Sequence, residues 1–129
     1  MIQTNVFDYV SVLDKAADAS WLRNEAIANN IANVDTPGYK RQDVNFEKQL
    51  RKAMKNSRYT SVDERVANID LERLNPITYR DHATLSYRLD GNNVDIDTEN
   101  VELASNQIRY QGLTDSISKH FEGLQLVMK

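Results

Sequence analysis

Histidine, cysteine and clustered acidic side chains are the residues best suited to acid–base, nucleophilic or metal chemistry. His82 and His120 are the only histidines, and neither has neighbours at metal-ligand spacing or in a nucleophile arrangement. Cysteine is absent, which excludes disulfides, thiolate metal sites and a cysteine nucleophile. We therefore expect no catalytic residue, no metal site and no cofactor, and the sequence does not indicate an enzyme.

The acidic run at residues 90–97 is the segment most similar to a calcium loop. In an EF-hand counted from Asp90, the glycine position is Asp95 and the bidentate glutamate position is Val101, so the pattern fails at both places. A turn followed by the start of a helix explains the run better.

Basic residues gather between positions 40 and 58, where seven lysines and arginines stand against two acids. The whole chain has a net charge of −3 and four scattered glycines, so it has neither a field that attracts nucleic acid nor a phosphate loop. We expect no nucleic-acid partner and no small-molecule substrate. The basic strip is either a solvated helix face or a surface for an acidic partner.

The first periodic segment predicts a long helix over residues 6–33. Its seam follows alternating steps of three and four, which is typical of a narrow coiled-coil contact. The seam is small and polar at its centre, at Ala17, Ser20 and Asn24. The expected packing residues are Val10, Leu13, Ala17, Ile27 and Ile31.

Residues 33–38 carry the signals that end this helix. Asn33 tolerates the left-handed conformation of a C-cap, Pro37 fits the second position of a turn, and Gly38 supplies a positive φ. A shorter helix follows, with Phe46, Leu50 and Met54 on one face.

Beyond that helix no period persists, but two alternating segments predict a small hairpin. These are residues 84–89 and 94–97, joined by a turn at residues 90–93.

A second long helix is predicted from about residue 98, capped by Asp97 or Thr98, to the last residue. Its apolar face begins at Val101, Ala104 and Ile108, and the pattern breaks near Gly112. A glycine here predicts the close approach of another helix. The expected packing residues are Ile108, Leu113, Ile117, Phe121 and Leu124.

The predicted fold is mainly α. Two long amphipathic terminal helices pack as an antiparallel, coiled-coil-like pair, with a small irregular or β-hairpin middle segment. The expected divisions are 1–40 (first helix and turn), 41–90 (middle segment) and 91–129 (C-terminal helix). Two such helices leave apolar stripes exposed, which indicates partners from other chains.

One segment is distinctive enough to suggest a family. Residues 27–40, Ile-Ala-Asn-Asn-Ile-Ala-Asn-Val-Asp-Thr-Pro-Gly-Tyr-Lys, closely resemble the N-terminal signature of the flagellar rod and hook family. Within that family, the signature resembles that of the proximal rod members, because it has Asp35, Pro37 and Tyr39. Residues 46–50, 89–97 and 106–110 resemble the same members, so the similarity includes both ends of the chain.

The signature contains three asparagines within five residues, although asparagine is a mediocre helix former. We hypothesise that they fix the register between neighbouring subunits by hydrogen bonding. The expected assembly residues are Asn29, Asn30, Asn33, Thr36, Pro37, Gly38 and Tyr39.

The resemblance implies a structural subunit of the proximal rod that polymerises through its terminal helices, transmits torque and forms the wall of the export channel. It also implies a place in the rod within the periplasmic space, reached through the flagellar type III apparatus without a cleaved signal. The implied partners are further copies of this chain, rod proteins of the FlgC and FlgF types, FliE, and the inner-membrane ring and export gate. The alternative is a cytoplasmic coiled-coil adaptor or export chaperone, which explains the amphipathic helices but not the signature.

Overall fold

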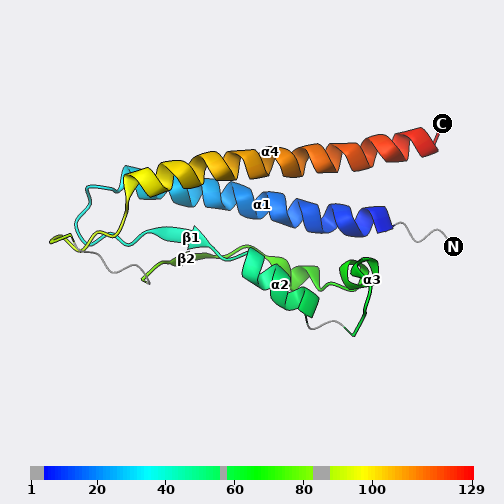
Figure 1. Cartoon of the computed structure of the whole chain (residues 1–129), viewed down its shortest axis with the longest axis horizontal. Helices are drawn as coiled ribbons and strands as arrows, with labels where there is room; N and C mark the ends of the chain where they lie inside the picture. The colour runs from blue at the N-terminus through cyan, green and yellow to red at the C-terminus, as the bar shows by residue number, and fades with distance from the viewer. Residues whose placement is uncertain (1–4, 56–57, 83–87) are drawn as a thin grey trace.

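The computed structural model describes residues 5–55, 58–82 and 88–129 and is mainly helical. Helices α1 and α4 run side by side in opposite directions, and the segment between them lies along the other side of α1 (Figure 1). This arrangement confirms the expected fold class. The elements are α1 (Asn5–Ala32), β1 (Gln42–Val44), α2 (Glu47–Lys55), α3 (Val62–Ala67), the 3₁₀ helix η1 (Leu71–Leu74), β2 (Thr78–Arg80) and α4 (Ile96–Val127).

Helix α1 ends where the sequence predicts, but by a different device. Among the described residues only glycines have a positive φ, so the expected left-handed cap at Asn33 is wrong. Instead, the Asn33 side chain donates to the carbonyl of Asn29 at 2.8 Å and accepts from the Thr36 hydroxyl at 3.0 Å. Gly38 has the expected positive φ, at 73°. The Asn29 carbonyl thus accepts both the backbone N–H and the side-chain amide of Asn33 at the end of the helix.

Helix α4 begins earlier than predicted because Asp95, and not Asp97 or Thr98, is its N-cap. The Asp95 carboxylate accepts hydrogen bonds from the backbone N–H groups of Asp97 at 3.0 Å and Thr98 at 3.5 Å. The helix then continues through Gly112 without a break to Val127. In the described ranges, no helix has a stretch apolar and long enough to cross a membrane.

The predicted hairpin is wrong in its second half, and most of its first half, residues 84–87, lies outside the described residues. Residues 94–95 form no strand and residues 96–97 belong to α4, since the capping bonds of Asp95 favour a helix start. The two-stranded sheet instead joins β1 and β2 in antiparallel register, with Asp43 opposite Tyr79.

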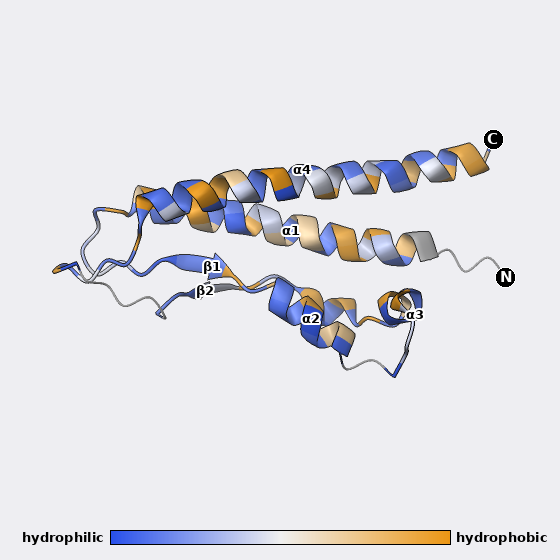
Figure 2. Ribbon diagram, in the orientation of Figure 1, coloured by the Kyte–Doolittle hydropathy of each residue, from blue (hydrophilic) through white to orange (hydrophobic). Residues whose placement is uncertain are grey.

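The hydrophobic core lies between α1 and the middle segment. Ala19, Val44, Phe46 and Leu74 are buried together, and half-buried residues such as Val12 and Leu22 pack against them. Figure 2 shows hydrophobic residues along the whole of α4, not confined to the side that faces α1.

The α1–α4 interface is polar at its centre. Asn106 of α4 is 2% exposed, and its amide donates to the backbone carbonyl of Ser20 at 2.8 Å and to the Asn24 side chain at 3.3 Å. Ser20, whose carbonyl accepts the first of these bonds, is a small residue and is itself buried. Helix α1 is therefore covered on two sides, by an apolar core on one and a polar contact on the other.

Leu74→Ala tests whether this small core stabilises the fold. Leu74 is fully buried, so the substitution leaves a cavity and is expected to lower the free energy of unfolding by about 2–5 kcal/mol. Ile77→Ala is the matched control, because Ile77 is 59% exposed and its truncation should change stability by less than about 0.5 kcal/mol. Urea unfolding followed by circular dichroism measures both, and equal effects would contradict this location of the core.

Candidate assembly site

The end of α1 and the turn before α4 form one docked unit. Asn92 is fully buried, and its amide lies within 2.9–3.0 Å of the backbone carbonyls of Asn33, Val34 and Thr36. The Gly38 N–H donates to the carbonyl of Asp90 at 2.7 Å. The amide of Asn92 therefore fixes the turn that directly follows α1, because it lies against three of the carbonyls of that turn.

Glycine is required where these two turns meet. Gly38 and Gly91 have φ values of 73° and 77°, a region that side chains with a Cβ rarely adopt. A Cβ on Gly91 would lie at an ordinary van der Waals distance of 3.8 Å from the Cα of Gly38, so the positive φ, and not a lack of space, is what requires glycine. The N-terminal signature and the acidic run near residue 90 are thus two halves of one structure.

Asn30 bonds entirely within the chain. It is fully buried, and its Nδ2 donates to the Gln42 carbonyl at 2.8 Å and to the Glu99 carboxylate at 3.1 Å. Its Oδ1 accepts from the Gln42 N–H at 2.7 Å and from the Tyr39 hydroxyl at 3.1 Å. Because both ends of the amide are occupied, the hypothesis of a bond to a neighbouring subunit is wrong for Asn30.

The charged side chain of Glu99 is buried in this region, where it forms an ion pair with Arg41. The Glu99 carboxylate, fully buried, accepts from the Arg41 Nε at 2.8 Å, and Arg41 also bonds Asp81 at 2.7 Å. Burial lowers the pKa of Arg41, but the hydrogen bonds to Glu99 and Asp81 outweigh burial and raise the pKa overall. Removing one partner of a buried ion pair leaves the other charge buried without a partner, which strongly destabilises the fold.

A second ion-pair cluster joins α1, α2 and α4. Arg23 donates to both carboxylate oxygens of Glu47, at 2.7 and 2.6 Å, and to the Val44 carbonyl at 2.9 Å. Arg109 of α4 donates to the same carboxylate at 2.9 Å. Burial raises the pKa of Glu47, but the hydrogen bonds from Arg23 and the charges of Arg23 and Arg109 lower it overall.

The predicted packing residues of α1 are all at least partly covered by the rest of the chain. Ala17 and Ile27 are buried, and Val10, Leu13 and Ile31 are half-buried.

In α4 the outcome is divided. Leu113, Ile117 and Leu124 are half-buried, whereas Phe121 is exposed and Ile108 is 74% exposed. The prediction that Ile108 packs against the first helix of its own chain is therefore wrong.

The error at Ile108 has a physical cause. The face of α4 that meets α1 contains Glu99, Leu103 and Asn106. A prediction from hydrophobicity alone does not select this face, because two of the three residues are polar. Val101, Ala104 and Ile108 lie on the opposite side and are exposed, together with Gly112. We call these four residues the outer stripe of α4. A Cβ on Gly112 would meet no described atom within 4 Å, so within the described chain no helix makes the expected approach there.

The signature residues separate into two groups. Asn30 is buried and Asn33 and Tyr39 are half-buried, and their side chains bond within the chain. Asn29, Thr36, Pro37 and Gly38 are exposed at the tip of the molecule. Among residues 5–55, 58–82 and 88–129, no group of three or more acidic or histidine side chains is placed to hold a metal ion.

Comparison with known proteins identifies the family. A family model described as flagella basal body rod protein matches residues 16–40. The chain is 36% identical to the flagellar basal body rod protein FlgB of Borrelia hermsii, over 97% of this chain and 99% of that protein. This chain belongs to the FlgB family. FlgB of Bacillus subtilis is 36% identical over 90% of this chain and 89% of its own length, and FlgB of Escherichia coli is 37% identical over 83% of each chain.

The family signature therefore coincides with the docked turns. Sequence reasoning missed five residues that join distant parts of the chain by hydrogen bonds: Arg23, Arg41, Asn92, Glu99 and Asn106. A charged or amide side chain on the face of α4 that meets α1, as at Glu99 and Asn106, is the signal that would have revealed two of them.

Asn30→Ala tests the buried amide. The change leaves the Gln42 N–H and one Glu99 oxygen without their partner, so we expect a loss of about 1–3 kcal/mol in the free energy of unfolding. Asn29→Ala is the control, since Asn29 is exposed on the same turn of helix. Urea unfolding of both variants is the measurement, and an Asn30→Ala variant as stable as the control would contradict the network.

Glu47→Gln tests the second cluster through its pH dependence. Because the pKa of Glu47 is lowered in the folded chain, its contribution to stability is present above the ordinary value of 4.5 and is lost as the pH falls below it. The wild-type chain should therefore lose more stability than Glu47→Gln between neutral and acidic pH. Urea midpoints across this range measure the difference, with Glu122→Gln on exposed α4 as the control. Identical pH profiles for wild type and Glu47→Gln would exclude the effect.

Proposed function

We propose that this chain is a structural subunit of the proximal rod of the flagellar basal body, polymerising through its terminal helices. The observation that carries the proposal is the outer stripe of α4, where Val101 is 67% and Ile108 is 74% exposed on a helix of a FlgB-family chain. A stripe of this kind, on a helix already packed along its other side, is suited to a further helix from a neighbouring subunit.

The charge and hydrogen-bond pattern supports a rigid building block. At the α1–α4 contact the Asn106 amide N–H group, the Glu99 carboxylate and the Arg41 guanidinium are bonded within the chain, so subunits meet through preformed surfaces. The exposed signature residues Asn29, Thr36, Pro37 and Gly38 form the tip of this block and are proposed contacts between subunits. Asn33 and Tyr39 are proposed to hold that tip in shape.

In this proposal the assembled helices form the wall of the export channel and transmit torque along the rod. The subunit occupies the rod in the periplasmic space after export by the flagellar type III apparatus without a cleaved signal. Its proposed neighbours are further copies of itself, rod proteins of the FlgC and FlgF types, FliE, and the inner-membrane ring and export gate.

Immunolabelling of purified hook-basal bodies tests the location. Label at the inner-membrane end of the rod is the expected result. Absence from intact basal bodies, with the protein retained in the cytoplasm, would reject the proposal and favour a cytoplasmic adaptor or export chaperone.

The double variant Val101→Asp with Ile108→Asp tests the outer stripe. Both positions are exposed, so the isolated chain should keep its circular dichroism spectrum, while the new charges should abolish incorporation into the rod and swimming. Gln107→Asp with Ser118→Asp is the control, since it also places two aspartates on exposed positions of α4, outside the stripe. A folded stripe variant that still swims would show that the stripe is not an assembly contact.

A further inference from the structure

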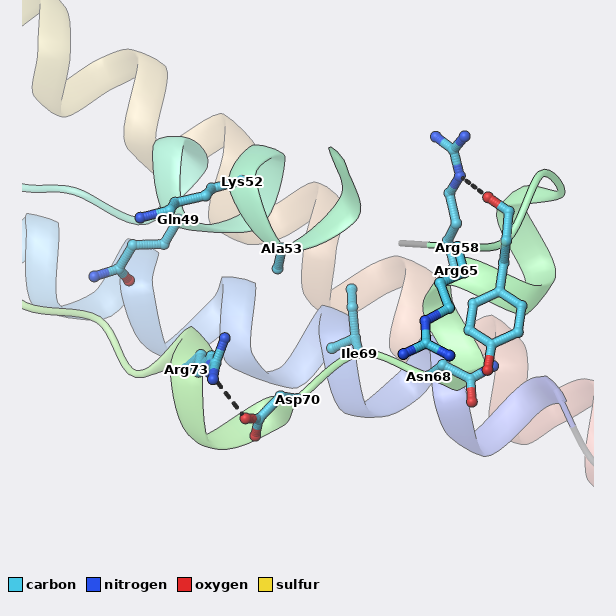
Figure 3. Close-up of a pocket in the computed structure, with 10 residues that line it drawn as sticks. Gln49, Lys52, Ala53, Arg58, Arg65, Asn68, Ile69, Asp70 and Arg73 are labelled. Atoms are coloured by element: carbon cyan, nitrogen blue, oxygen red, sulfur yellow. Dashed lines mark hydrogen bonds and ion pairs between the residues drawn. The ribbon is translucent and has the colours of Figure 1, made fainter. Parts of the chain in front are cut away.

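A basic cleft of about 610 Å³ lies between α2 on one side and α3 and η1 on the other (Figure 3). Its cations are Lys52, Arg58, Arg65 and Arg73, against one acid, Asp70. The proposed terminal-helix contacts make no use of this cleft, which belongs to the middle segment.

Part of the positive charge of the cleft is not neutralised within the chain. Arg73 pairs with Asp70 at 3.2 Å, and Arg65 donates to the Tyr59 carbonyl at 2.8 Å. In the described part of the chain, no carboxylate forms an ion pair with Lys52 or Arg58. Ala53 and Ile69 add apolar surface between the cations. The cleft thus suits a segment that carries both carboxylates and apolar side chains.

The first two turns of α4 have that composition. Asp97 and Glu102 are exposed, and among the described residues neither forms an ion pair. Ile96 and Val101 beside them are exposed apolar residues, at 41% and 67%. We call residues 96–102 the acidic start of α4.

The cleft and the acidic start cannot meet within one chain. The acidic start lies at the end of the molecule where the two turns dock, whereas α2 lies near the middle and α3 nearer the termini, both on the far side of α1 from α4 (Figure 1). Two different complementary surfaces on one molecule define a heterologous contact, which forms an open chain of subunits unless a rotation closes it.

We propose that the basic cleft of one subunit binds the acidic start of α4 of a second copy of this chain. This inference rests on the proposed role as a self-assembling rod subunit and names a contact that joins the middle segment of one copy to the start of α4 of the next. Charge complementarity favours this pairing, because two basic clefts or two acidic starts repel each other, whereas a cleft and an acidic start attract.

Cysteine cross-linking in assembled basal bodies tests the contact. The chain has no cysteine, so Lys52→Cys combined with Glu102→Cys gives every subunit one reporter in the cleft and one on the acidic start. Oxidation should produce a reducible ladder of multimers in cells that carry only this variant, because each subunit can bond two others. Each single-cysteine variant should give no ladder, and Lys48→Cys with Asp115→Cys is the matched pair outside both surfaces.

The outcomes separate this inference from the proposed function. Protein found in the rod without a ladder, or cross-linked only to a different protein, overturns the cleft contact and leaves the rod assignment standing. Protein absent from the rod overturns both.

Charge exchange provides a second test in the same cells. Lys52→Glu with Arg58→Glu should abolish swimming, as should Asp97→Lys with Glu102→Lys, and the four substitutions together should restore it. Lys48→Glu with Arg51→Glu on the same helix α2 is the control for charge alone, and circular dichroism checks folding of each variant. If the folded four-substitution variant fails to swim, the contact is rejected. Vesicles of anionic lipid that bind the wild-type protein but not Lys52→Glu with Arg58→Glu, in the absence of a ladder, would assign the cleft to a membrane surface instead.

Discussion

The fold depends on how the end of α1 is closed. The buried amide of Asn92, distant in sequence, lies against three backbone carbonyls of the turn that directly follows this helix. This contact brings the turn before α4 onto the turn after α1, which starts α4 in the opposite direction along the same side. A polar contact at one end therefore sets the antiparallel direction of the two helices. Because the direction is set there, the residues along the α1–α4 interface can be small and partly polar.

Helix α1 is the centre of the molecule because every other layer packs on it. On one side it contributes Ala19 to the apolar core with Val44, Phe46 and Leu74. On the other it receives Asn106 and, through Asn30, the buried charge of Glu99. Two opposed contacts explain why α1 is rich in alanine and asparagine, since larger residues would keep the flanking layers apart. The side of α4 that faces away from α1 packs against no other described layer of the chain, and its apolar residues are exposed.

The sequence predicts the helices well and their contacts unevenly. Periodicity and turn residues locate α1 to within a residue at each end, because Pro37 and Gly38 allow few alternatives. The start of α4 is missed by two residues because an aspartate at 95 competes with one at 97 for the same capping role. The sheet is missed because β1 and β2 have only three residues each, too few for an alternating pattern to show.

The site is harder to predict for a different reason. Hydrophobicity selects Val101, Ala104 and Ile108 as the packing face of α4, whereas the real face contains Glu99 and Asn106. Their burial is favourable only because Arg41, Asn30 and Ser20 are brought opposite them, and that information is long-range. The family resemblance in the signature identifies the same turns without explaining them.

The polar seam has a mechanical consequence. Two helices joined only by apolar side chains can slide along each other by a turn and exchange one set of contacts for a similar one. Here a slip of that size would pull Asn106 from the Ser20 carbonyl and Glu99 from Asn30, leaving buried polar groups without partners. Sliding of one helix along the other therefore costs the free energy of these buried hydrogen bonds, so the polar seam fixes the axial position of the two helices.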